Sequence, residues 1–319
     1  MKNLFICLTP LQALIAQALI RQTAPIPADL LMVCYPEADN AKFHHYYQQT
    51  AAQCQHSSYQ IMPNGRFQRE FALPKLLKNL EKSYQTIYAA SIDNPIVQYP
   101  LSHLNFQALE TFDDGTGNLY PNSILYQNPP HSLKRKIINQ IQGIHYQTQD
   151  LRQLSRQHHT LYPNQPNIVS PTIHVQLWQM QPENQTPFSG CQNTQKILLG
   201  QPLFPEAEQN ITLAQHIAQK YQILQYFPHP RENYSVDNME YIDTPLIFED
   251  YLLQQIQKQP ETQFHIYHLA STAALNVSHF LRVQIHTIQP NNALFKQQNF
   301  TTLYQIMKNM GLHIENLTD

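Results

Sequence analysis

Short apolar runs alternate with helix-like stretches along most of this chain, and that alternation limits the folds open to it. The first example is LFICL at residues 4–8, which is typical of a fully buried strand. Thr9 then suits a helix N-cap, Pro10 the first helical position and Gln12 the N3 position of a capping box. A buried strand that leads directly into a capped helix is how a βαβ unit begins, so the sequence predicts an α/β fold with an open parallel sheet.

The alternation occurs in two blocks, separated by a stretch without sustained periodicity. Residues 145–192 are rich in Gln, His, Asn and Pro. At 319 residues the chain is long enough for two domains, each with its own core. The pattern alone therefore predicts two α/β domains over 1–155 and 193–319, with a linker region over 156–192. Two Rossmann-like halves that face a cleft, with a last helix able to pack back on the first domain, are one known arrangement of such domains. The supporting apolar runs lie at 4–8, 30–36, 85–91, 106–115, 196–202, 221–230, 244–256, 264–276 and 283–289.

Charge and cysteine content narrow the classes of partner and compartment. The 20 Lys and Arg residues against 22 Asp and Glu give a net charge of −2, whereas a nucleic-acid binder normally has a basic excess. No GxGxxG or GxxxxGK[ST] motif occurs, which disfavours NAD-type and ATPase-type phosphate loops. The four cysteines, Cys7, Cys34, Cys54 and Cys191, form no CxxC motif and predict a reducing compartment. A small molecule or a glycan is the expected partner.

Neither a signal peptide nor a membrane span is predicted. Lys2 precedes an apolar stretch, but polar residues interrupt that stretch and no cleavage site is clear. Elsewhere no segment reaches about 18 uninterrupted apolar residues, the length that a spanning helix needs.

The sequence TFDDGTGN at 111–118 contains the end of the run at 106–115 and places two adjacent carboxylates at the end of an expected strand. Ligands of parallel α/β sheets bind beyond the carboxyl ends of the strands. Asp113 and Asp114 repel each other, which can raise the pKa of one of them toward that of a general base. Two of only seven glycines, Gly115 and Gly117, lie in this stretch. The alternative is an Asp-Gly turn with solvated carboxylates.

Three further strand ends have unusual residues. In LLGQPLFPEAE, Gly200, Gln201 and Pro202 follow a strand, and Glu206 and Glu208 enter a helix, whose dipole alone could explain them. In QYFPHPREN, two prolines hold the backbone on either side of His229, and Arg231 beside it suits a phosphate. In HLASTAALN, Ser271 and Thr272 lie where a strand turns into a helix, as an anion site or as an ordinary N-cap.

Taken in order, these motifs resemble those of bacterial sialyltransferases. FDDG at 112–115 and FPHPRE at 227–232 match the two signatures, and AST at 270–272 fits the Ser-Ser/Thr element. The opening LFICLTPLQALIAQ resembles the start of glycosyltransferase family 52, the lipooligosaccharide sialyltransferase family. The resemblance implies a GT-B-like fold, with an acceptor-side first domain and a second domain that binds the CMP donor.

The resemblance also implies roles for particular residues. His229 would assist the departure of CMP, Arg231 would support the charge of the site, and Ser271 and Thr272 would hold the CMP phosphate. Glu249 falls where related enzymes place a ribose-binding carboxylate. Asp113 or Asp114 would deprotonate the acceptor hydroxyl, with Glu206 or Glu208 as the alternative base. The remaining implied contacts are Gly200, Gln201 and Pro202 on the donor side, and Thr9, Pro10, Gln12 and Gly115 on the acceptor side.

The implied reaction is an inverting transfer of sialic acid from CMP-sialic acid to a galactose-type hydroxyl of a lipooligosaccharide or capsular glycan. We expect no cofactor and no metal, because Arg, His and a helix N-terminus can neutralise the phosphate and Asp113-Asp114 is not a DxD motif. Two alternatives remain: the same fold could transfer another nonulosonic acid or glucose, or the chain could be a non-catalytic nucleotide- or glycan-binding module.

A cytoplasmic location is expected, and residues 132–141 allow peripheral contact with the inner membrane surface. This stretch, SLKRKIINQI, places Lys134, Arg135 and Lys136 beside Leu133, Ile137 and Ile138, as in a modest basic amphipathic helix. A solvated helix face is the alternative interpretation. The sequence also leaves open whether the chain forms a homodimer.

Overall fold

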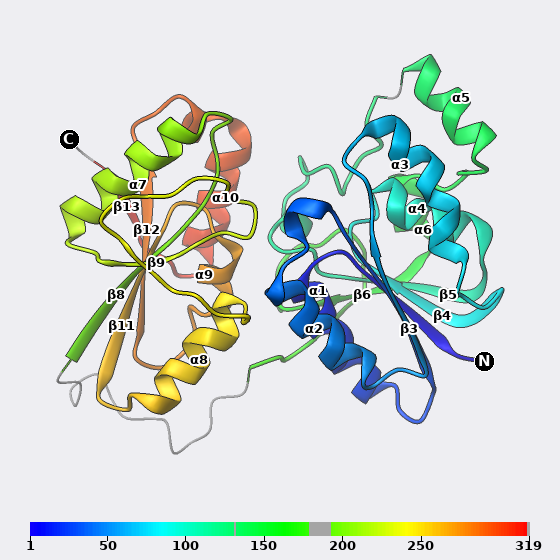
Figure 1. Ribbon diagram of the computed structural model, residues 1–319, viewed down its shortest axis with the longest axis horizontal. Coiled ribbons are helices and arrows are strands. Elements are labelled where there is room, and N and C mark those ends of the chain that lie inside the picture. The colour runs from blue at the N-terminus through cyan, green and yellow to red at the C-terminus, as the bar shows by residue number, and fades with distance from the viewer. Residues whose placement is uncertain (131, 179–192, 318–319) are drawn as a thin grey trace. The chain divides into compact units, whose positions relative to one another are not determined.

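The computed structural model describes residues 1–130, 132–178 and 193–317 and divides the chain into two compact units (Figure 1). The first unit is Met1–Leu177 and the second is Trp178–Asp319. Each unit is built on one sheet in which every strand pairing is parallel. The α/β prediction is therefore confirmed, and the two Rossmann-like units correspond to a GT-B-like plan.

The first unit has a seven-stranded sheet in the order β3-β2-β1-β4-β5-β6-β7. The apolar runs of β1, β2 and β4 form its centre, and their side chains belong to one buried cluster that includes Leu4, Leu31 and Ile87. The strands are β1 (Asn3–Cys7), β2 (Ala28–Cys34), β3 (His56–Ile61), β4 (Ser83–Ala89), β5 (Asn105–Phe112), β6 (Ser155–Thr160) and β7 (Thr172–His174). The helices are α1 (Pro10–Gln22), η1 (Pro36–Ala38), α2 (Ala41–Ala51), α3 (Arg66–Ala72), η2 (Leu73–Leu77), α4 (Pro95–His103), η3 (Gly117–Leu119), α5 (Leu133–Ile141) and α6 (Thr148–Leu154).

The second unit has a six-stranded sheet in the order β10-β9-β8-β11-β12-β13. Figure 1 shows α7 on one face of this sheet and α8, α9 and α10 on the other. The strands are β8 (Asn193–Leu199), β9 (Gln225–Phe227), β10 (Glu240–Tyr241), β11 (Thr262–His268), β12 (Val283–Pro290) and β13 (Ile314–Leu317). The helices are α7 (Ala207–Tyr221), α8 (Phe248–Lys258), α9 (Thr272–Asn276), η6 (Leu294–Lys296) and α10 (Gln298–Asn309).

The first unit extends to Leu177, beyond the boundary expected at residue 155. The reason is that β6 and β7, from the segment expected to be a linker, pair with β5 and complete the first sheet. β6 has the sequence SRQHHT, and its buried side chains are polar. Part of the expected linker, residues 179–192, lies outside the described residues, as does Cys191.

The α1 helix begins as predicted, although Gln12 is used differently. Thr9 Oγ1 accepts a hydrogen bond from the Gln12 backbone N at 3.2 Å, and Pro10 is the first helical residue. The Gln12 side chain does not complete a capping box, because its Oε1 accepts from the backbone N of Leu8 at 2.6 Å. Its amide nitrogen is thereby aimed at the carboxyl ends of β4 and β5.

Cys7, Cys34 and Cys54 are free thiols. Burial raises the pKa of the Cys54 thiol to about 12, so this thiol is inert. Within residues 1–130, 132–178 and 193–317, every helix is too short or too polar to cross a bilayer.

Candidate active site

The second sheet brings three loops together at its carboxyl edge, those that contain Gly200, His229 and Ser271. β8 lies between β9 and β11, so the loops that follow these three strands emerge side by side. This is also where the strand order changes direction, the position at which open α/β sheets bind ligands. Gln201 joins two of the loops, because its Oε1 accepts hydrogen bonds from the backbone N of Leu269 at 2.8 Å and of Ala270 at 2.9 Å.

His229 lies in the loop after β9 and has a defined tautomer. Its Nδ1 accepts a hydrogen bond from the backbone N of Arg231 at 3.1 Å. A neutral imidazole with an accepting Nδ1 has its proton on Nε2, so His229 Nε2 is the hydrogen-bond donor of the ring. The ring is half-buried and Arg231 is exposed. One donor and one cation therefore lie two residues apart at the edge of the sheet.

Glu232 holds this loop in place, a role that the motif alone did not indicate. Its Oε1 accepts from the backbone N of His229 at 2.8 Å, and its Oε2 accepts from the Tyr226 hydroxyl at 3.0 Å. Burial raises the pKa of the Glu232 carboxyl. Gly200 makes room for this carboxyl, since a Cβ at position 200 would lie 1.9 Å from Glu232 Oε1 and 2.6 Å from the Tyr226 hydroxyl.

Ser271 and Thr272 lie at the start of α9, beyond the carboxyl end of β11. Ser271 is the N-cap residue, yet its side chain makes no capping hydrogen bond. The backbone N of Ser271 instead donates to His268 Nδ1 at 3.0 Å, and His268 Nε2 contacts Thr287 Oγ1 at 2.9 Å. Burial lowers the pKa of His268 to about 3, so this ring stays neutral and serves as a fixed support.

Glu249 lies in the first turn of α8 and is almost fully buried. Its Oε1 accepts a hydrogen bond from Asn276 Nδ2 at 2.7 Å, which connects α8 to α9. Only 4% of the residue is exposed to solvent. The carboxylate therefore packs against the C-terminal end of α9.

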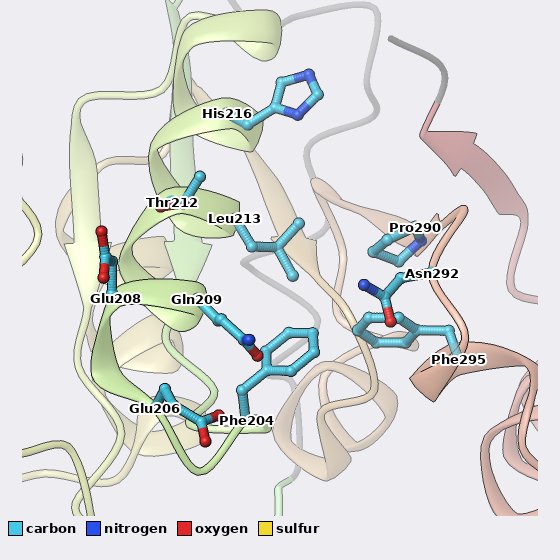
Figure 2. Close-up of a pocket in the computed structure, with 10 residues that line it drawn as sticks. All are labelled: Phe204, Glu206, Glu208, Gln209, Thr212, Leu213, His216, Pro290, Asn292 and Phe295. Carbon is cyan, nitrogen blue, oxygen red and sulfur yellow. The ribbon is translucent and has the colours of Figure 1, made fainter.

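Glu206 and Glu208 line a pocket beside the same edge of the sheet (Figure 2). The pocket has a volume of about 550 Å³ and lies between the N-terminal half of α7 and the segment after β12. Phe204 and Phe295 form its apolar part, with ring centroids 6.2 Å apart at 73°. Glu206 is exposed at the N-cap of α7, and its side chain makes no capping hydrogen bond. Apolar walls with a few polar groups are typical of small-molecule pockets in general.

Asp113 of the first unit is fully buried and saturated with internal hydrogen bonds. Its Oδ1 contacts His158 Nε2 at 2.9 Å, and its Oδ2 accepts from Thr160 Oγ1 at 2.9 Å and from the backbone N of Leu161 at 2.6 Å. Its exposed fraction is 0%. This geometry joins β5 to β6 and leaves no face of the carboxylate toward solvent.

Asp114 lies at the carboxyl ends of β1, β4 and β5, together with the residues expected on the acceptor side. Its Oδ1 accepts from Gln12 Nε2 at 2.5 Å and its Oδ2 from Ser91 Oγ at 2.6 Å. Burial raises the pKa of the Asp114 carboxyl, the nearby Asp113 charge raises it further, and the hydrogen bonds from Ser91 and Gln12 oppose both effects. Gly115 follows with φ = 74°, a left-handed conformation that explains the glycine.

Asp93 is a carboxyl group that the sequence interpretation missed. Burial, with a contribution from the charge of Asp114, raises its pKa from 3.8 to about 6. It lies between β4 and α4, where the chain reads SIDNP. An Asp placed just after an apolar strand was the available signal, but the adjacent carboxylates at 113–114 gave a stronger one.

The described residues hold no cluster of three or more His, Cys, Asp or Glu side chains that could bind a metal ion.

Comparison with known proteins decides the family. The sequence matches glycosyltransferase family 52 over residues 28–292, which is most of its length. The chain belongs to glycosyltransferase family 52. The resemblance inferred from the motifs is confirmed.

Relatives of this family 52 chain include named sialyltransferases. A CMP-N-acetylneuraminate:beta-galactoside alpha-2,3-sialyltransferase from Pasteurella multocida (strain Pm70) is 37% identical over 276 residues, which cover 86% of this chain and 87% of the relative. An N-acetyllactosaminide alpha-2,3-sialyltransferase from Haemophilus influenzae (strain ATCC 51907 / DSM 11121 / KW20 / Rd) is 31% identical over 90% of this chain and 92% of its own length. A relative with the same description from Neisseria meningitidis serogroup A / serotype 4A (strain DSM 15465 / Z2491) is 27% identical over 90% of this chain and 78% of its own length.

A solved structure also resembles this family 52 chain. The glycotransferase of kitacinnamycin superposes with a TM-score of 0.50 and 9% sequence identity, covering 99% of this chain and 85% of that one. At that identity the similarity concerns the fold alone, and it agrees with the GT-B-like plan.

The singled-out residues of the family 52 chain thus fall into two groups, one in each unit. The second unit holds the loops with Gly200, Gln201, Pro202, His229, Arg231, Ser271 and Thr272, with Glu249, Glu206 and Glu208 at the same edge. The first unit holds Thr9, Pro10, Gln12, Asp113, Asp114 and Gly115.

Proposed function

We propose that this family 52 chain is an inverting sialyltransferase that moves sialic acid from CMP-sialic acid to a hydroxyl of a β-galactoside. The observation that supports this most is that the His229 loop and the Ser271 loop flank the loop after β8 at the switch point of one sheet, where Gln201 is bonded to the Ser271 loop. The relatives supply the chemistry that such a site would perform, since one is named for CMP-N-acetylneuraminate and β-galactoside.

The donor would bind through its phosphate at these two loops. The Nε2–H of His229 and the guanidinium of Arg231 would hydrogen-bond the phosphate, and the hydroxyls of Ser271 and Thr272 would complete its contacts. As the glycosidic bond breaks, negative charge grows on the phosphate, and His229 would stabilise it or supply a proton. Glu249 would hold a ribose hydroxyl. These groups balance the charge of the phosphate without a metal, so we expect chelation by EDTA to leave the rate unchanged.

Glu206 is the residue that we favour as the base, for reasons of geometry. Asp113 is saturated and buried, and both oxygens of Asp114 accept short hydrogen bonds. Glu206 is exposed at the mouth of an aromatic pocket in the same unit as His229. Attack by an activated hydroxyl from the face opposite to the phosphate inverts the anomeric carbon.

The base assignment is tested by comparing two matched variants. Glu206→Gln should lose transfer by about 10²-fold or more while CMP binding stays normal, because removing a general base affects the chemical step. Asp114→Asn should keep most of its activity. An active Glu206→Gln protein beside an inactive, folded Asp114→Asn protein would move the base to the first unit.

The donor assignment is tested by thermal unfolding with CMP, CDP, UDP and NAD. Selective stabilisation by CMP is expected, since a ligand that binds only the folded state raises its stability. Stabilisation by UDP but not by CMP would favour transfer of another sugar.

We place the enzyme in the cytoplasm, with a lipooligosaccharide or capsular glycan as the acceptor.

A further inference from the structure

The α5 helix buries two polar side chains and exposes three large apolar ones. Arg135 and Asn139 are buried, with 8% and 5% exposed. Leu133, Ile137 and Ile141 are spaced four residues apart on one side of the helix and are 79%, 57% and 80% exposed. An ordinary surface helix shows the reverse arrangement. The fold of the first unit therefore does not use the apolar side of α5.

The α3 helix lies against α5 and also exposes apolar rings. Glu70 of α3 forms an ion pair with Arg135, and its carbonyl oxygen accepts from Gln142 Nε2 at 3.0 Å. Phe67 and Phe71 of α3 are 76% and 69% exposed, with their ring centroids 4.8 Å apart. Two neighbouring helices thus leave five large apolar side chains in contact with solvent (Figure 1 shows both helices). Exposed apolar groups of this density mark an interaction surface.

The charge around these side chains is strongly positive. Residues 67–78 and 132–142 contain six Lys and Arg residues and one acidic residue, Glu70. The chain as a whole has a net charge of −2, so this excess is local. Lys134 and Lys136 of α5 are exposed beside the apolar stripe.

We propose that α3 and α5 form a docking surface for a membrane that contains anionic lipids. Aliphatic and aromatic side chains would enter the boundary between headgroups and acyl chains, while the surrounding lysines bind phosphate headgroups. A second copy of this chain is a poorer occupant, because a symmetric contact through this surface would bring two cationic patches together. The proposal goes beyond the transfer reaction, because vesicle binding does not depend on catalysis.

The test measures cosedimentation of the full chain with vesicles. Wild type should bind vesicles of phosphatidylcholine with about one third phosphatidylglycerol, and should bind pure phosphatidylcholine much more weakly. The double variant Ile137→Ser, Ile141→Ser should bind the anionic vesicles about tenfold more weakly or worse, because two aliphatic side chains no longer enter the bilayer. Lys134→Gln with Lys136→Gln should weaken binding roughly 30-fold, and high salt should have a similar effect.

Matched controls make the result specific to this surface. Leu224→Ser with Ile61→Ser removes two exposed apolar side chains outside α3 and α5, and should leave vesicle binding unchanged. Activity on a soluble galactoside should be the same in all variants, which shows that they are folded. Failure of wild type to bind anionic vesicles would overturn the proposal. So would a dimer in sedimentation velocity that the Ile137→Ser, Ile141→Ser variant converts to a monomer.

Discussion

At the scale of single residues, hydrogen bonds to neighbouring groups, more than the two flanking prolines, fix the tautomer and the position of His229. The hydrogen bond from the Arg231 backbone N to Nδ1 fixes the tautomer, and Glu232 fixes the backbone N of His229. The sequence indicated His229 and Arg231 through the motif. It could not indicate the role of Glu232, because a carboxyl after an HPR motif has no feature of its own until Tyr226 and Gly200 are placed around it.

Replacement of His229 should separate catalysis from folding. We expect His229→Ala to lower kcat by about 10²–10⁴-fold, because the group proposed to stabilise or protonate the leaving phosphate is lost, with little change in the unfolding midpoint. His313→Ala, at an exposed position of the same unit, is the matched control and should keep wild-type turnover. Normal turnover by folded His229→Ala protein would remove this residue from the mechanism.

Asp93 makes the stability of the first unit depend on pH. Its pKa of about 6 in the folded state lies above the unfolded value of 3.8, so the folded state keeps the proton longer. The associated stability is fully present below pH 3.8 and is lost as the pH rises toward about 6.

The Asp93→Asn variant should therefore stabilise the protein at neutral pH. The expected gain is about 1–3 kcal/mol near pH 7.5 and close to zero near pH 4, because only the charged carboxylate is penalised by burial. Urea unfolding of both proteins at the two pH values measures the difference. Asp243→Asn, at an exposed carboxyl, should show no such pH dependence. An equal effect of Asp93→Asn at both pH values would contradict the account.

At the scale of elements, the loop after β8 depends on a glycine for steric reasons. A Cβ at position 200 would lie 1.9 Å from Glu232 Oε1, so a larger residue must displace the carboxyl that holds the His229 loop. Gly200→Ala should destabilise the protein by roughly 1–3 kcal/mol and lower turnover as well. Gly65→Ala is the control, since its nearest neighbour is the flexible end of Gln68 at 3.0 Å. Unchanged stability and turnover in Gly200→Ala would show that Glu232 is not needed where it lies.

The elements themselves could be predicted where burial is apolar and not where it is polar. The expected runs at 30–36, 85–91 and 283–289 correspond to β2, β4 and β12. The strand β6 was missed because its buried residues are all polar, and periodicity cannot recognise them as interior. They are Ser155, His158, His159 and Thr160. His158 contacts Asp113 and His159 contacts Glu110, so the partners that make this burial possible lie more than 40 residues earlier.

The same long-range pairing explains the uncertainty about the base. Two adjacent carboxylates at a strand end suggested a reactive pair, and the sequence could not show that Asp113 is bonded to β6. The sequence also named Glu206 but gave no indication of the pocket, because Phe204 and Phe295 are far apart in the chain.

At the scale of the whole molecule, two parallel sheets contribute separate groups of residues. The residues proposed to bind the donor come from adjacent loops of the second sheet, and those expected on the acceptor side come from adjacent loops of the first. Motif order along the chain predicted that the two groups fall on two different sheets. The reason is that carboxyl ends of neighbouring parallel strands meet at one edge, whatever the lengths of the connections between them.

The most direct test of the central claim is product analysis with purified protein, CMP-sialic acid and N-acetyllactosamine. Mass spectrometry and nuclear magnetic resonance should show one sialylated product for each CMP released, with the anomeric configuration inverted relative to the donor. His229→Ala protein should form almost none of it under the same conditions. Absence of sialylated product from folded wild-type protein, or a product that retains the configuration of the donor, would contradict the assignment of an inverting sialyltransferase.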